Sequence, residues 1–109
     1  MFVLIDDLRD INQFVRPSDK KLVIRTFDEG MSFVKHTNLQ DITLLMDNDL
    51  DDETPGHEGY DILSCAIDAN NLPHRVMLVT SNPVARMKMS KLLEYTQQYR
   101  QIGSLFVRK

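Results

Sequence analysis

Four short runs of apolar residues, none of them alternating with polar residues, constrain most strongly what this chain can fold into. A strand with one face in water alternates apolar and polar side chains, whereas a strand buried on both faces of a parallel sheet has a continuous apolar sequence. A fifth, weaker run stands near the C-terminal end. The predicted strands are residues 2–5, 22–27, 42–47, 75–80 and 104–109.

Helical patterns separate these runs. Thr26 and Glu29 have the spacing of a capping box and precede an apolar stretch. A second helical face spans residues 60–67, and a third helix is predicted to begin at Asn82-Pro83 and to reach about residue 100. The segment between the first two runs is short and contains Pro17, so it has room for one short helix or an irregular crossover.

Strands that alternate with helices predict an α/β fold, in which a doubly wound parallel sheet of about five strands is joined by right-handed crossovers. We expect one domain over residues 1–109, with a short first helix and no helix after the last strand. Such a domain leaves one face of its sheet partly bare, which favours a homodimer or a protein partner that covers this face.

Composition narrows the classes of function. The chain of 109 residues is 42% hydrophobic and has a formal net charge of −3, so no global field draws it to nucleic acid or to acidic lipid. No apolar run is long enough to span a membrane, and the N-terminal run is too short for a signal sequence. We therefore expect a soluble, cytoplasmic protein.

Polar side chains follow the predicted strands at their C-terminal ends, and parallel crossovers bring these ends to one edge of the sheet. Three carboxylates, two hydroxyls and a cation at one edge predict a site for a divalent ion, most suitably Mg²⁺, and for a phosphoryl group beside the third helix N-terminus. The residues are Asp6, Asp7, Asp47, Thr80, Ser81 and, after the fifth run, Arg108 or Lys109.

The order of these groups resembles the receiver domain of bacterial response regulators. The resemblance implies a flavodoxin-like sheet in which Asp6, Asp7 and Asp47 bind Mg²⁺, Asp47 accepts phosphate, and Thr80 is the switch hydroxyl. Arg108 or Lys109 is only an approximate counterpart of the lysine that ends the fifth strand of such domains. A phospho-accepting receiver is therefore one of the functions that the sequence leaves open.

A closer resemblance is to the cyclic-phosphate processing receiver-like family. The matching segments are "IDDLRD", "RTFDEG", "MDNDLDDETPGHEGYDIL" and "TSNPVARMKM". The resemblance implies a phosphate-bearing ligand, either a small cyclic-phosphate nucleotide or a nucleic-acid end. It also implies site residues, which are Asp47 and Asp49 for catalysis, Asp6, Asp7 and Asp47 for the metal, and Thr80, Ser81, Asn82 and Arg86 for phosphate.

Two departures from this family bear on catalysis. The family carries histidines at the positions of Asn48 and Val79, and a histidine pair is what acid–base opening of a cyclic phosphate would use. The resemblance therefore implies that this chain binds a phosphate-bearing ligand more readily than it turns one over, and whether it is an enzyme stays open. A catalytically inactive protein-interaction module with the same fold is the alternative.

Two further alternatives concern single segments. Asp47, Asp49, Asp51 and Glu58 occupy ligand positions of an EF-hand loop, although Asp52 stands where that loop requires glycine. A basic side on the third predicted helix could contact phosphate or RNA, although a solvated helix face is the commoner reason for such charges. Its residues are Arg86, Lys88, Lys91 and Arg100.

Overall fold

A single six-stranded sheet runs through the computed structural model, which describes every residue from Met1 to Lys109. The strand order is β2-β1-β3-β4-β6-β5, and the first four strands are parallel to one another. The predicted α/β alternation and the parallel pairing of these four strands are confirmed. Their bounds are Phe2–Ile5 for β1, Lys21–Ile24 for β2, Thr43–Met46 for β3 and Arg75–Leu78 for β4.

The C-terminal part of the sheet differs from the prediction. β5 (Tyr99–Ile102) and β6 (Leu105–Arg108) form an antiparallel hairpin around Gly103, whose φ is +62°, and β6 pairs antiparallel with β4. The predicted parallel fifth strand and the predicted helix up to residue 100 were therefore wrong. The chain turns soon after the last helix, and a two-residue turn can join only antiparallel strands.

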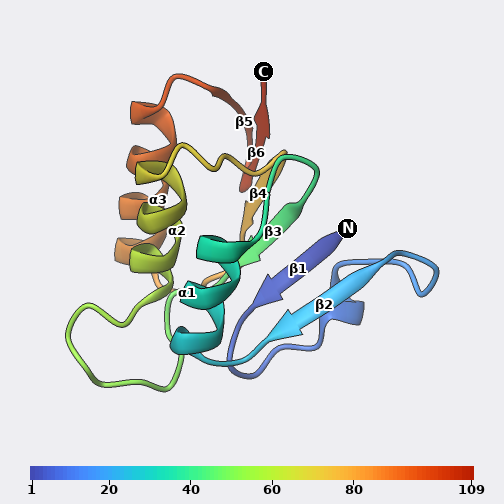
Figure 1. Cartoon of the computed structure of the whole chain (residues 1–109), viewed down its shortest axis with the longest axis vertical. Coiled ribbons are helices and arrows are strands. Elements are labelled where there is room, and N and C mark those ends of the chain that lie inside the picture. Colours follow the sequence, from blue (N-terminus) through green and yellow to red (C-terminus); the bar gives the residue numbers. More distant parts are fainter.

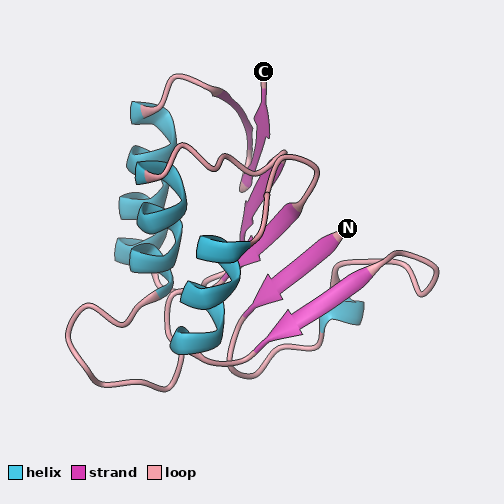
Figure 2. Cartoon of the chain, viewed as in Figure 1, coloured by secondary structure: helices cyan, strands magenta, loops and turns pink.

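Three helices cover one face of the sheet (Figures 1 and 2). They are α1 (Phe27–His36), α2 (Gly59–Asp68) and α3 (Pro83–Tyr95), and none is long and apolar enough to cross a membrane. Thr26 caps α1 by accepting a hydrogen bond from the Glu29 amide, and Asn82 caps α3 through the amides of Val84 and Ala85. Both predicted caps are confirmed, and the main core lies between these helices and the sheet.

The opposite face of the sheet has only a short cover. A 3₁₀ turn, η1 (Ile11–Gln13), is the sole helical element in the β1–β2 connection, and Ile11 and Val15 pack there on Leu4 and Leu45. Farther along this face Met77 of β4 and Val79, which follows β4, are only half-buried. The predicted short first helix and partly bare sheet face are thus both present.

The start of α2 lies against the end of β3. The Gly59 amide donates a 2.9 Å hydrogen bond to the Asn48 carbonyl, and a Cβ atom added to Gly59 would lie 1.8 Å from the Asp47 carbonyl oxygen. Only glycine permits this approach, since the conflict is with backbone that cannot rotate away. Gly59 therefore fixes where the helix begins relative to the carboxylate-bearing end of β3.

We expect Gly59→Ala to destabilise the domain by about 3 kcal/mol, because the added methyl group overpacks a backbone contact. Gly30→Ala is the matched control, since a Cβ at Gly30 would meet mainly the movable Cδ1 atom of Ile62, at 2.7 Å. Urea denaturation measures both free energies of unfolding. Equal stabilities for the two variants would contradict this account of the β3–α2 junction.

Candidate functional site

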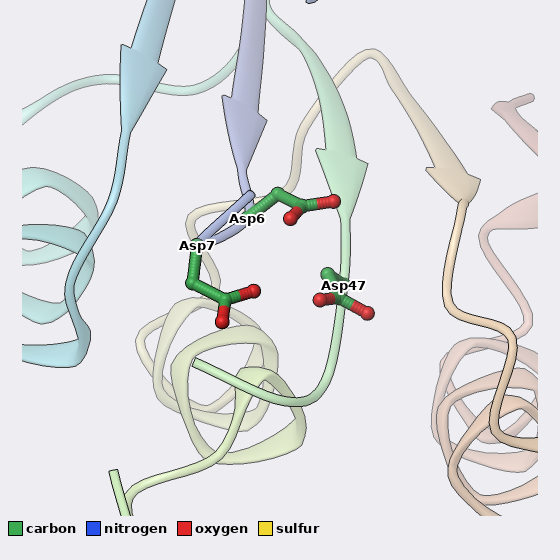
Figure 3. A group of neighbouring side chains, drawn as sticks. All are labelled: Asp6, Asp7 and Asp47. Carbon is green, nitrogen blue, oxygen red and sulfur yellow. The ribbon is translucent and has the colours of Figure 1, made fainter. Parts of the chain in front are cut away.

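Three carboxylates meet where β1 and β3 end, as the sequence predicts. Asp6 and Asp7 follow β1, Asp47 follows β3, and one oxygen of each lies within 4.8 Å of the others. Figure 3 shows the three side chains at these neighbouring strand ends. Parallel pairing of Ile5 with Met46 sets the residues that follow them side by side, so the sheet register itself creates the cluster.

Burial makes this cluster energetically demanding. Asp6 is fully buried and Asp47 is 5% exposed, so both carboxylates have lost most of their contact with water. A buried charge is costly unless a partner of opposite charge or several hydrogen bonds compensate for it. The question that the site raises is therefore which groups carry out that compensation.

Arg9 supplies a positive charge within the cluster. One of its guanidinium nitrogens lies 2.8 Å from Asp6 Oδ2 and 3.4 Å from Asp47 Oδ1. The amides of Leu8 and Arg9 both donate to Asp6 Oδ1. Arg25 in turn donates to the Arg9 carbonyl at 2.7 Å, which holds this turn against the end of β2.

The three carboxylates differ in their pKa values. Burial alone raises the pKa of Asp6, but the hydrogen bonds from Arg9 and from the two backbone amides outweigh it, so the pKa lies below its ordinary value. Burial raises the pKa of Asp47 above the ordinary value, and the charge of Asp6 adds to this. The pKa of Asp7 is also raised, by burial and by the charges of Asp6 and Asp51. Asp6 is thus well compensated, while Asp7 and Asp47 are not.

Two of the predicted phosphate-side residues lie beside these carboxylates. Thr80 is fully buried, and its hydroxyl lies close enough to Asp47 to lower the pKa of that carboxyl. Ser81 is exposed and lines the same cleft as the three carboxylates, as does Asp49. The fourth strand therefore delivers its hydroxyls to the edge that the sequence predicts.

Asn82 and Arg86 are placed differently. The Asn82 side chain is used in capping α3. Arg86 donates to the Thr80 carbonyl at 2.6 Å and to the Ser104 hydroxyl at 3.1 Å, so it ties α3 to the sheet. It lines a groove with Ser81 rather than the carboxylate cleft itself.

The predicted C-terminal cation does not reach the site, which corrects the sequence prediction. Because β6 is antiparallel to β4, Arg108 lies at the N-terminal ends of the parallel strands, on the side of the sheet away from the carboxylates. There it donates to the carbonyls of Leu72 and Gln40. The Lys109 amide bonds to the Gln98 carbonyl at that same edge. The cation beside the carboxylates is Arg9, and its signal in the sequence was the basic residue that follows the acid pair in the segment "IDDLRD".

The acidic segment after β3 is a loop and not an EF-hand, because a strand and not a helix precedes it. Glu58 ends this loop as the N-cap residue of α2, in a capping box with Asp61, and it accepts a 2.8 Å hydrogen bond from the Asn48 side chain. Arg100 likewise lies on β5, so the predicted basic helix face keeps only Arg86, Lys88 and Lys91.

Asn48 and Val79, the two positions at which the sequence departs from the family pattern, lie on opposite faces of the sheet. Asn48 bonds to Glu58 and to the Tyr60 amide at the start of α2. Val79 packs with the small cluster around Leu4 on the face away from the helices. Histidines at these two positions would therefore approach the strand ends from different sides.

Comparison with known proteins gives one match. Residues 1–95 fit the family model described as the cyclic-phosphate processing receiver domain. No curated protein and no solved structure matches the chain significantly. The matched residues include every carboxylate and hydroxyl of the strand-end cluster, and they stop where α3 ends.

We expect Arg9→Met to destabilise the protein by about 2 kcal/mol without divalent ions, because it leaves the buried Asp6 carboxylate without its counter-charge while keeping the apolar stem. Arg16→Met is the control, since Arg16 is 84% exposed and lies 3.6 Å from Asp19 at the surface. Chemical denaturation at neutral pH measures both. A loss for Arg9→Met no larger than that for Arg16→Met would show that Arg9 does not compensate the cluster.

Proposed function

The chain belongs to the cyclic-phosphate processing receiver domain family, and from that premise we propose that it binds a divalent ion, Mg²⁺, together with a phosphate group at the carboxyl ends of its parallel strands. The ligand class is a cyclic-phosphate nucleotide or a nucleic-acid end that carries such a phosphate. The observation that carries the proposal is the convergence of three carboxylates within 4.8 Å at one sheet edge.

The donor set suits Mg²⁺. This ion takes hard oxygen ligands, usually one or two carboxylates together with water and phosphate oxygens. Asp7 has no ion-pair partner and Asp47 has only the longer contact with Arg9, so these two carboxylates have capacity left for a cation. Asp6, whose oxygens already accept from Arg9 and two amides, would act directly only if Arg9 moved, and otherwise through water.

The phosphate would lie on the β4 side of the cleft. Ser81 offers an exposed hydroxyl there, and the Thr80 hydroxyl lies next to Asp47. We keep Asn82 and Arg86 as proposed phosphate-side residues at the start of α3, where Arg86 shares a groove with Ser81 outside the carboxylate cleft. Asp49, exposed on the far rim, would orient water or the metal's outer ligands. A dianionic phosphate beside so many carboxylates needs the metal between them, so metal and phosphate should bind together.

We expect Mg²⁺ to raise the melting temperature of the wild type, since a ligand that binds only the native state stabilises it by mass action. Asp47→Asn should melt higher than the wild type without divalent ions, because the raised pKa of Asp47 means that its charge costs stability at neutral pH. For the same reason the wild type should gain stability as the pH falls through that raised pKa. The variant should lose the response to Mg²⁺.

The control for this melting experiment is Asp41→Asn, which removes an exposed carboxylate away from the strand ends. It should respond to Mg²⁺ as the wild type does. A wild-type melting curve that millimolar Mg²⁺, Mn²⁺ and Ca²⁺ all leave unchanged would overturn the metal site and with it the proposed function.

A specific observation bears against a phospho-accepting receiver. The C-terminal cations Arg108 and Lys109 lie at the opposite edge of the sheet, so no lysine from the last strand stands beside Asp47. We expect little or no phosphate transfer from a small phosphodonor such as acetyl phosphate to Asp47. Intact-mass spectrometry tests this, and a phosphorylated species that disappears in Asp47→Asn would assign the chain to signalling receivers instead.

The second candidate function is a protein-interaction module, which the half-buried and exposed apolar side chains of the bare sheet face favour. They are Met77, Val79, Ile102, Leu105 and Val107. A module of this kind would bind its partner equally well with Asp47→Ala. A metal-and-phosphate-dependent function would not survive that substitution, so the two candidates separate in one binding assay.

A further inference from the structure

A second hollow adjoins the carboxylate cleft. It has a volume of about 410 Å³ and lies between the loop that follows β3 and the start of α3. Asp49 lines both this hollow and the cleft that holds Asp6, Asp7 and Asp47, so the two spaces meet at that residue. A ligand whose phosphate lies in the cleft would therefore have this hollow beside it, next to Asp49.

His57 lines this hollow and is held there from two sides. Its Nδ1 atom lies 2.9 Å from Asp52 Oδ2. Its ring stacks on Phe27, with ring centroids 4.1 Å apart and an interplanar angle of 6°. Phe27 is itself buried at the first turn of α1, which Thr26 caps, so the stack fixes the imidazole to a rigid element.

The contact with Asp52 determines which nitrogen of the neutral His57 ring carries the proton and which keeps its lone pair. The pKa of Asp52 is lowered by a hydrogen bond from the Thr54 amide and by His57, so this carboxylate is ionised and can only accept. Nδ1 must then carry the proton that it donates to Asp52. In the neutral ring this leaves the lone pair on Nε2, which is the arrangement of a general base oriented by a carboxylate.

Neither of the other two histidines, nor Asn48 in the same hollow, is a titratable group that lines the hollow and is oriented by a carboxylate. His36 ends α1 and His74 precedes β4, so both lie toward the opposite edge of the sheet. Asn48, which lines the same hollow, has no titratable group and is already bonded to Glu58 and to the Tyr60 amide. His57 is 34% exposed and is thus both oriented and accessible to a ligand.

We propose that His57 is the acid–base residue of this site, acting on a cyclic phosphate ester held in the adjoining cleft. The inference rests on the proposed function, because the phosphate must first bind at the strand ends. Nε2 takes a proton from a water molecule as the water oxygen bonds to phosphorus. The bond from phosphorus to the 2′ or 3′ oxygen breaks, that oxygen takes a proton from solvent, and His57 returns its proton to solvent.

With His57 as the acid–base residue, the lack of histidine at positions 48 and 79 no longer implies a lack of turnover. The sequence favoured binding over turnover because both of those positions lack an acid–base group. His57 brings one from the loop instead, through a contact with Phe27 that joins segments thirty residues apart in the chain. Turnover is then retained through a different part of the fold.

The experiment follows hydrolysis of 2′,3′-cyclic AMP, and of an RNA oligonucleotide with a 2′,3′-cyclic phosphate end, in the presence of Mg²⁺ or Mn²⁺. We expect His57→Gln to lower kcat by about 10²–10⁴-fold, which is the usual contribution of a positioned acid–base group. His74→Gln, the matched control at the other edge, should keep the wild-type rate. The Mg²⁺-dependent rise in melting temperature should be the same in all three proteins.

A second variant separates chemistry from structure. His57→Ala should be inactive and should regain activity when imidazole is added, since the removed ring leaves space beside the hollow. Wild-type rates in His57→Gln, or no rescue of an inactive His57→Ala by imidazole, would overturn the proposal. Binding of Mg²⁺ with no wild-type hydrolysis of either substrate would overturn it while leaving the proposed function intact. Absence of Mg²⁺ binding would remove the proposed function itself.

Discussion

The rest of the structure depends on the burial of carboxylate charge at two neighbouring strand ends. Asp6 and Asp47 follow adjacent parallel strands and are almost completely shielded from water. Their charges repel each other, and without compensation they would have to be protonated or the strand ends would have to separate. Arg9 and the amides of the turn after β1 compensate Asp6, so the charge that stays uncompensated falls on Asp47 and Asp7. We therefore expect a divalent cation at this site to stabilise the protein.

The surrounding elements hold this edge in place. Gly59 brings the start of α2 against the Asp47 carbonyl, and Asn48 joins the same junction to Glu58. The loop between β3 and α2 is then anchored a second time, through the stack of His57 on Phe27. The cleft and the hollow beside it thus share one wall, whose position depends on β3, α1 and α2 together. The proposed metal binding and the proposed acid–base chemistry would therefore both depend on the C-terminal ends of the same parallel strands.

Much of this arrangement is predictable from the sequence, because a parallel sheet places the ends of its strands by topology alone. Once residues 2–5 and 42–47 are assigned to neighbouring parallel strands, Asp6, Asp7 and Asp47 must converge. The direction of β6 was not predictable in the same way, since an apolar run does not indicate which way a strand points, and the antiparallel hairpin carried Arg108 to the opposite edge. The sequence did not identify Arg9 as the cation that compensates the carboxylates, nor His57 as the acid–base residue proposed above, because both assignments depend on tertiary contacts, with Asp47 in one case and with Phe27 in the other.

The measurement that tests the account most directly is anomalous diffraction from crystals of the protein grown with Mn²⁺, which takes the same oxygen ligands as Mg²⁺. We expect one strong anomalous peak between the carboxylates of Asp7 and Asp47, where β1 and β3 end, and no such peak in crystals of Asp47→Asn. Manganese bound only at the exposed acidic loop, or no ordered peak at the strand ends under saturating Mn²⁺, would contradict it.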